Sequence, residues 1–106
     1  MIWVKITTQD SMVKTLEVTG HADFSEHGQD IVCAACSLVS VGLLNAIDEM
    51  CNGQCELLQE ENRIYIEVKE NDERLQTALN VGIIQYKTLA EEFRKYIRVK
   101  KTEVKL

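Results

Sequence analysis

One segment restricts the fold of this chain more than any other: the apolar run from Ile31 to about Met50, which follows Asp30. Asp30 is a favourable helix N-cap, so the run is predicted to be a helix. Its side chains are apolar almost all round, and such a helix is usually buried on more than one side. One side is expected to pack on a sheet, and another on a second helix or a partner chain.

The rest of the chain supplies that sheet. Residues 2–7 alternate between apolar and other side chains, Leu16 and Val18 indicate a second strand over about residues 13–19, and Ile64, Ile66 and Val68 alternate within RIYIEVKE. With QCELLQ as a further strand, four strands are expected. Asn71 is the predicted cap of a second helix, and YIRVKKTEV is a possible fifth strand. The second helix is expected to bury the stripe Leu75, Leu79, Ile83, Tyr86, Leu89 or Ala90, and Phe93. The order ββαββα(β) predicts an α+β fold in which residues 1–106 form one domain, with helices in one layer and a mainly antiparallel sheet in the other.

Location is predicted from what the sequence lacks. The run from Ile31 to Ile47 contains two serines and an asparagine, and is judged too short and too polar to span a membrane. The first residues, MIWVKITT, do not resemble a secretion signal. A cytoplasmic protein without a membrane partner is therefore expected, with its four cysteines as reduced thiols.

The charge is unevenly distributed. The net charge is −5, yet the segment from Arg94 to Lys105 holds six of the 12 basic residues and one acid. The remainder has six basic and 16 acidic residues, a charge of −10. A body this acidic predicts no direct binding of nucleic acid and would suit a basic partner, although solubility alone explains it equally well.

Cys33 and His21 are the candidates for chemistry. Cys33 would lie in the first turn of the helix capped by Asp30, where the helix dipole stabilises the negative charge of a thiolate, the nucleophilic form. His21 lies 12 positions upstream across a loop that can fold back toward the sulfur. The two would then act as nucleophile and general acid/base, although spacing alone also allows an inert cysteine buried in a helix.

Neighbouring polar residues have alternatives of their own. Asp30 is either a plain cap, which is the favoured interpretation, or a carboxylate that orients His21. Ser37 shares a helix face with Cys33 and either bonds locally, which is favoured, or contributes to the site.

The spacing Cys33-x-x-Cys36 allows a redox pair or, with His21 and His27, a metal site. Cys36 is more simply a small core residue, and no metal or cofactor is predicted. Cys51 and Cys55 flank a turn and are expected to be structural.

The loop after His21 is predicted to close over the site. Gly20 and Gly28 bracket it, and flexible glycines suit a segment that opens and closes. The alternative is a loop already fixed by packing of Phe24. The residues assigned to this lid are Ala22, Asp23, Phe24, Ser25, Glu26, His27, Gly28 and Gln29.

The stretch GHADFSEHGQDIVCAACSLVS resembles the signature of the Prp-type ribosomal-processing cysteine proteases. That signature is Gly-His-Ala, a short loop, then Gly-x-Asp-Ile-Val-Cys-Ala, with a serine further along. The resemblance covers the whole chain, including NAI at Asn45 to Ile47 and the closing YIRV. Cys36 departs from the small residue that many relatives have there.

The resemblance implies a cytoplasmic, homodimeric endopeptidase without a cofactor. Its substrate would be a large-subunit ribosomal protein precursor, from which it removes a short N-terminal extension, cutting after an aromatic residue and before a small one. Cys33 would be the nucleophile and His21 the general base and then acid, while the role of Asp30 stays open. Two other hypotheses remain: a non-catalytic ribosome-assembly module that binds a basic ribosomal protein, and a thiol redox or metal protein.

Overall fold

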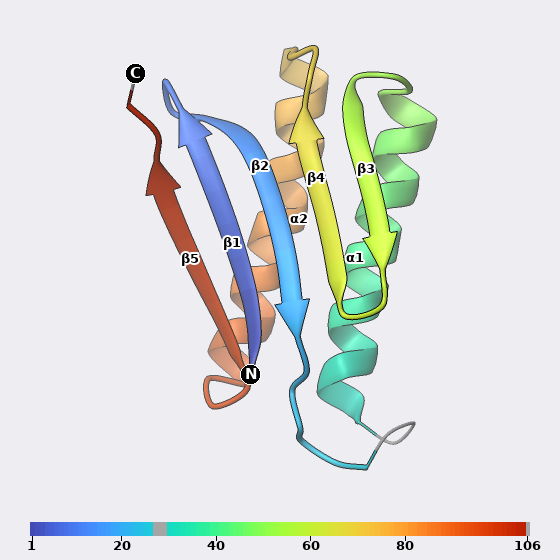
Figure 1. Cartoon of the computed structure of the whole chain (residues 1–106), viewed down its shortest axis with the longest axis vertical. Helices are drawn as coiled ribbons and strands as arrows, with labels where there is room; N and C mark the ends of the chain where they lie inside the picture. The colour runs from blue at the N-terminus through green and yellow to red at the C-terminus, as the bar shows by residue number, and fades with distance from the viewer. Residues whose placement is uncertain (27–29, 106) are drawn as a thin grey trace.

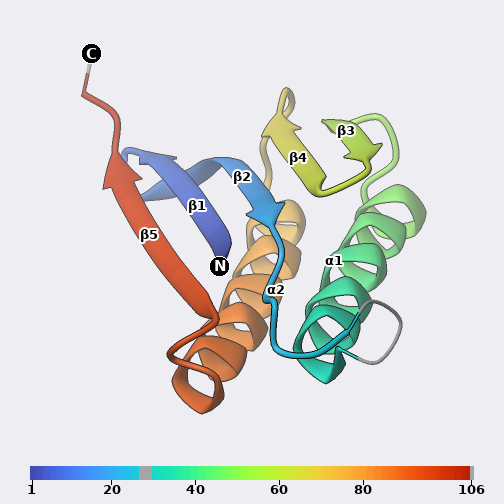
Figure 2. The same cartoon turned by 60° about the horizontal axis from the view of Figure 1, so that its bottom comes forward.

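The computed structural model describes residues 1–26 and 30–105. A five-stranded sheet with the strand order β3-β4-β2-β1-β5 forms one layer, and both helices cover one of its faces (Figure 1, Figure 2). The predicted α+β fold and its element order are confirmed. In chain order the elements are β1 (Ile2–Gln9), β2 (Met12–Gly20), α1 (Ile31–Met50), β3 (Cys55–Glu60), β4 (Arg63–Val68), α2 (Glu73–Glu92) and β5 (Ile97–Glu103).

The sheet is mainly antiparallel, as expected, with one parallel pair. β1 pairs antiparallel with β2, β2 with β4 and β4 with β3, whereas β5 runs parallel to β1. The parallel pair follows from the connection, because α2 carries the chain back along the sheet before β5 begins. β5 thereby places the basic C-terminal segment beside the first strand.

The period of two in the strands divides the sheet into an inner and an outer face. Ile2, Val4 and Ile6 are buried under the helices, while Trp3 and Lys5 between them are exposed. One apolar face on the core and one face in water is the usual arrangement of such a sheet. The core therefore lies between the inner face and the two helices.

α1 buries one stripe of its side chains in the core and leaves other apolar side chains, such as Leu38 and Met50, exposed. Val32, Leu44 and Ile47 are among its buried residues, and it packs against α2. By length and composition alone it is also apolar enough to cross a membrane, which corrects the sequence argument that it is too short and too polar. That argument ended the run at Ile47, whereas the helix extends to Met50.

The N-cap of α2 corrects a second detail. Asp72, not Asn71, caps the helix, and its side chain accepts a hydrogen bond from the Leu75 N–H at 2.8 Å. The Asn71 side chain instead accepts from Gln76 Nε2, also at 2.8 Å. Asp is as good a cap as Asn and adds a negative charge at the positive end of the helix, so the position one residue later is preferred.

Candidate active site

A cleft of about 610 Å³ is lined by residues at the end of β2 and in the first half of α1. The end of β2 and the start of α1 lie at the same end of the molecule (Figure 1). One wall is the first half of α1, another is the end of β2 with the residues after it, and a third is the turn between β3 and β4. His21 and Cys33, the two residues predicted to act together, both line it. The other lining residues that matter below are Ile2, Asp23, Ser25, Asp30, Ser37, Gln59, Glu60, Asn62 and Arg63.

Cys33 lies in the first turn of α1, as predicted, and is half-buried at the base of this cleft. The backbone N–H of Ala22 points at its sulfur, with 3.4 Å between the nitrogen and Sγ. Ala22 itself is buried, with 3 % of its surface exposed. The chain after β2 therefore places a buried backbone donor beside the candidate nucleophile.

Asp30 joins the helix start to the loop. One carboxylate oxygen accepts the Cys33 N–H and the other accepts the Phe24 N–H, both at 2.9 Å. Partial burial tends to raise the pKa of this carboxyl, but hydrogen bonds from the backbone of Cys33, Phe24 and Ser25 outweigh it and lower the pKa below its ordinary value. Asp30 thus caps the helix and also holds the loop at Phe24 against the helix start. None of its described contacts is with His21.

His21 directly follows the last residue of β2. Gly20 there has φ +93° and sits so close to the first residue that only glycine fits, since an added Cβ would lie 2.2 Å from the Met1 carbonyl oxygen. The Met1 amino group donates to the His21 carbonyl. The His21 side chain is exposed and lines the same cleft as Cys33, and no hydrogen bond joins the two side chains.

The other cysteines are placed as predicted. Cys36 is 4 % exposed in the core, and burial raises the pKa of its thiol to about 11. Cys51 is buried and Cys55 is half-buried. Burial, and to a smaller extent the nearby Cys51, raises the pKa of the Cys55 thiol to about 11 as well. All four cysteines are free thiols. Among residues 1–26 and 30–105, no group of three His, Cys, Asp or Glu side chains is arranged to hold a metal ion.

Ser37 and Ser40 are two polar residues of α1 that line the cleft. Ser37 is exposed and lines the cleft, one turn after Cys33, so the structure brings it into the site. Ser40 is buried and its hydroxyl pairs with that of Tyr86 at 2.7 Å. That hydrogen bond ties α1 to α2 beneath the cleft.

The described part of the predicted lid is anchored. Asp23 and Ser25 line the cleft, and the Phe24 ring packs edge-on against Tyr96 and Phe93, with ring centres 5.1 and 6.3 Å away. This contact and the hydrogen bond to Asp30 favour the alternative of a loop start fixed by Phe24. The remaining lid residues, His27, Gly28 and Gln29, lie outside the described residues.

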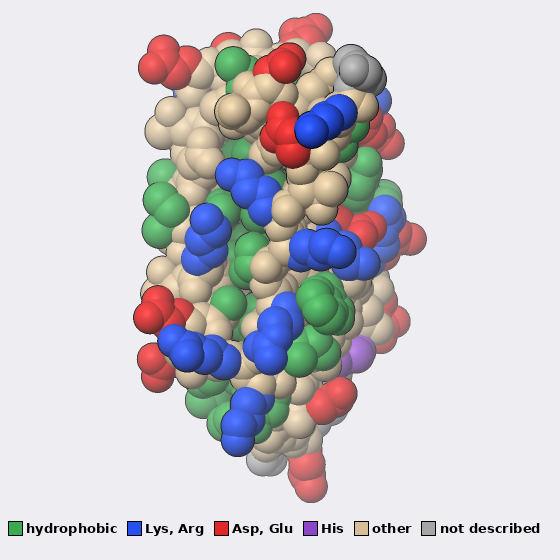
Figure 3. Space-filling view, turned by 90° about the vertical axis from the view of Figure 1, so that its left-hand side faces the viewer, with side chains coloured by type: hydrophobic (Ala, Val, Ile, Leu, Met, Phe, Trp, Pro, Cys, Tyr) green, Lys and Arg blue, Asp and Glu red, His purple; other side chains and the backbone are tan. Residues whose placement is uncertain are grey.

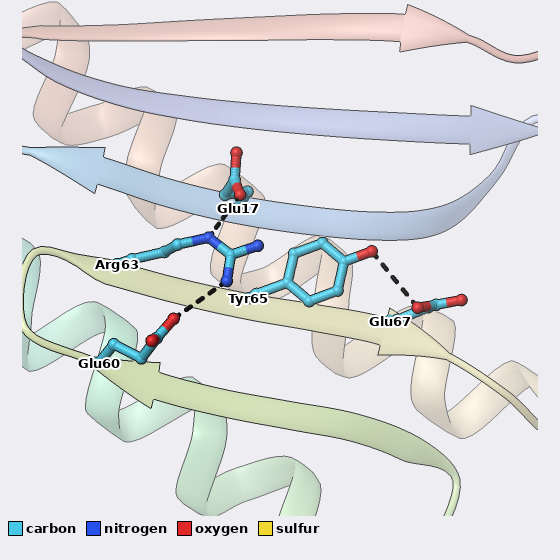
Figure 4. Close-up of polar contacts among 5 residues, drawn as sticks. All are labelled: Glu17, Glu60, Arg63, Tyr65 and Glu67. Carbon is cyan, nitrogen blue, oxygen red and sulfur yellow. Dashed lines mark hydrogen bonds and ion pairs between the residues drawn. The ribbon is translucent and has the colours of Figure 1, made fainter.

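The third wall contains residues that sequence reasoning missed. Arg63 Nε lies 2.8 Å from a carboxylate oxygen of Glu17, and Arg63 Nη1 lies 3.1 Å from one of Glu60 (Figure 4). The hydrogen bonds to these two acids raise the pKa of the guanidinium further. Glu60 is exposed and lines the cleft with Arg63. From the sequence, this segment was recognised only as a turn between two strands. Residue 60 comes close to residue 33 only when the sheet has formed, so their spacing in the sequence gives no sign of it.

Comparison with known proteins identifies relatives over nearly the full chain. The family described as cysteine protease Prp matches residues 1–98. The ribosomal processing cysteine protease Prp of Staphylococcus aureus is 32% identical over 103 residues, which are 93% of this chain and 97% of that protein.

Solved structures of that family have the same fold as this chain. The S. aureus protease Prp with a covalently linked product peptide superposes with a TM-score of 0.91 at 31% identity, covering 96% of this chain and all of that one. The same protease with a substrate peptide gives a TM-score of 0.84 at 30% identity, with the same coverage.

Proposed function

This chain belongs to the cysteine protease Prp family and is a cysteine protease, and we propose that it cleaves a short N-terminal extension from the precursor of a large-subunit ribosomal protein. One observation carries the proposal: His21 and Cys33 line the same cleft, and the backbone N–H of Ala22 points at the sulfur. Thiol proteolysis requires an activated thiol, a histidine that can reach it and space for the peptide substrate. Cys33 at the helix N-terminus, His21 and the cleft that they share are suited to these three roles.

In the proposed first step, Cys33 Sγ attacks the carbonyl carbon of the scissile bond after its proton has passed to His21. The adduct collapses when the imidazolium donates that proton to the leaving amine, which releases the shortened ribosomal protein and leaves a thioester on Cys33. In the second step His21 removes a proton from water as the water attacks the thioester. The extension then leaves with a free carboxyl group, and the thiol is restored.

The negative oxygen of the adduct needs a donor, and the structure narrows the choice. The Cys33 N–H is already donated to Asp30, and the Ala34 N–H to the Asp30 carbonyl. The Ala22 N–H, in contrast, donates among the described residues only to the Cys33 sulfur, which is a weak acceptor. We therefore assign Ala22 as the proposed oxyanion donor, since an oxygen on the carbon bonded to Sγ would fall within reach of this N–H.

The charge of the cleft supports a basic substrate. Asp23, Asp30 and Glu60 line it, and Arg63, which is paired with Glu17 and Glu60, is the cation among the described lining residues. Proteins that assemble on RNA are rich in Lys and Arg, and an acidic cleft raises the local concentration of such a chain. The family resemblance adds a cut after an aromatic residue and before a small one.

The test is incubation of the purified protein with the extended ribosomal precursor, with the new N-terminus identified by mass spectrometry. A single new N-terminus is expected with wild-type protein and with the matched Cys36→Ala control, and none with Cys33→Ala. Binding of the precursor without any cleavage by wild-type protein would instead indicate the assembly module.

We also propose a homodimer formed through the outer surface of the two helices. Leu38, Val81 and Ile84 are 76%, 52% and 62% exposed, and beside them a largely apolar groove of about 760 Å³ runs between α1 and α2. A second copy of this chain would cover these side chains. Sedimentation at micromolar concentration should show a dimer that Leu38→Glu converts to monomer; a monomeric wild-type protein would contradict this.

A further inference from the structure

The outer face of the sheet carries a group of side chains that the proposed proteolysis does not use. On the neighbouring strands β1 and β5, Trp3 lies beside Arg98 and Lys5 beside Lys100 in the parallel register. All four side chains are exposed, and 40% of the Trp3 surface is open to solvent. We call these four residues the basic face. Trp3 is thus an exposed aromatic side chain that shares one face of the sheet with three cations.

The charge of the basic face is not neutralised by its neighbours. Within the described part of the chain, none of Lys5, Arg98 and Lys100 forms an ion pair. Glu17 stands across from Lys5 on β2, but its carboxylate forms an ion pair with Arg63. Figure 3 shows Lys and Arg gathered over this side of the molecule, with hydrophobic side chains among them.

Acidic and basic side chains are therefore unevenly distributed over the strands of the sheet, which the net charge of the whole chain does not reveal. Glu17, Glu67 and Glu60 lie on the strands β2, β4 and β3, whereas β5 and the turn before it carry most of the basic segment. The expectation of no nucleic-acid contact came from the charge of the whole chain. It does not apply to a face where exposed charge is positive and uncompensated.

We propose that the basic face binds single-stranded RNA. Lys5, Arg98 and Lys100 would contact phosphates, and the exposed indole of Trp3 would stack on an unpaired base. Sheets that bind single strands combine these two elements, a positive track for the backbone and an aromatic platform for the bases. A bare polyanion would need only the cations, and a duplex keeps its bases stacked out of reach of the indole.

Binding on this face leaves the cleft free. Ile2 and Trp3 are adjacent in β1 and therefore point to opposite faces of the sheet, and Ile2 lines the cleft while Trp3 belongs to the basic face. RNA binding and peptide cleavage are thus separable activities. The choice of RNA as the nucleic acid rests on the proposed ribosomal substrate, but its measurement does not depend on cleavage.

Trp3 makes the test direct, because it is the single tryptophan of the chain. The full-length protein is titrated with a single-stranded 12-nucleotide RNA while tryptophan fluorescence and the anisotropy of a label on the RNA are followed. Saturable quenching of Trp3 is expected at the same midpoint as the anisotropy change. The logarithm of the binding constant should fall with the logarithm of salt concentration with a slope near −2, since about 0.7 is expected for each of three phosphates.

Matched variants complete the experiment. Lys5→Gln, Arg98→Gln and Lys100→Gln combined should abolish binding at 150 mM salt, while Lys87→Gln on the exposed side of α2 should bind as wild type. Trp3→Leu should weaken binding roughly tenfold or more by anisotropy, with peptide cleavage unchanged. The proposal is overturned if RNA fails to quench Trp3, if a 12-base-pair duplex RNA binds as tightly, or if the triple variant binds like Lys87→Gln.

Discussion

Replacement of Gly20 by alanine should damage both the fold and the catalytic cleft, through two contributions that the structure separates. Gly20 has φ +93°, a conformation that costs a residue with a Cβ about 1–2 kcal/mol. Its new Cβ would also lie 2.2 Å from the Met1 carbonyl oxygen, a contact that cannot be kept. The resulting displacement of backbone adds about 1–3 kcal/mol, so Gly20→Ala should lower the free energy of unfolding by about 2–5 kcal/mol.

Gly53 provides the matched control. It has φ +81°, but a Cβ there would meet nothing within 4 Å. Gly53→Ala should therefore show the conformational cost alone, about 1–2 kcal/mol. Denaturant unfolding of the three proteins measures both values. Because Gly20 sets the position of His21, Gly20→Ala should also lower kcat/KM for the substrate peptide at least tenfold under conditions where it remains folded, and Gly53→Ala should not. Equal losses of stability in the two variants, or full activity in Gly20→Ala, would refute this reasoning.

Three further predictions concern Asp30, the thiols and the buried hydroxyl pair. The pKa of Asp30 in the folded protein lies below its ordinary value of 3.8, so the carboxylate stabilises the fold above about pH 4 and loses that effect as pH falls through its folded pKa. Asn caps a helix as well as Asp, so Asp30→Asn removes mainly the negative charge at the helix N-terminus. Wild type should thus be more stable than Asp30→Asn at neutral pH by about 0.3–1 kcal/mol, a difference that shrinks in acid and that pH-dependent unfolding measures. At pH 8 iodoacetamide should modify Cys33 well before Cys36, because a thiol with a pKa of about 11 is ionised in roughly one molecule in a thousand; peptide mapping that found Cys36 first would contradict this. Tyr86→Phe leaves the Ser40 hydroxyl buried without its partner and should cost about 1–3 kcal/mol in unfolding experiments, part of which the double variant with Ser40→Ala recovers.

Much of the fold was predictable because local pattern and tertiary packing agree. Asp30 caps α1 as expected, and the alternation in residues 2–7 defines the buried face of β1. The cap of α2 was displaced by one residue because Asn71 and Asp72 are both good caps, and only their contacts decide between them. The parallel pairing of β5 with β1 depends on how α2 returns the chain, which no local pattern records.

The sequence predicted the reacting residues of the candidate site, but not the other residues that line its cleft. Cys33 and His21 belong to a recognisable motif within one stretch of chain. Glu60 and Arg63 enter the cleft only because β4 pairs with β2 and β3 in a particular register, so their place could not be derived from spacing. The backbone donor of Ala22 was equally hidden, since every residue has an N–H and only the folded loop aims this one at the sulfur.

The central claim, that Cys33 carries the reaction as a covalent nucleophile, is tested most directly by trapping the acyl-enzyme. The protein is mixed with a peptide that spans the cleavage site, quenched in acid during turnover, digested and mapped by mass spectrometry. We expect the N-terminal part of the peptide attached as a thioester to Cys33 and to none of Cys36, Cys51 and Cys55. Turnover at an unchanged rate in Cys33→Ala, or an adduct on any other cysteine, would contradict the mechanism.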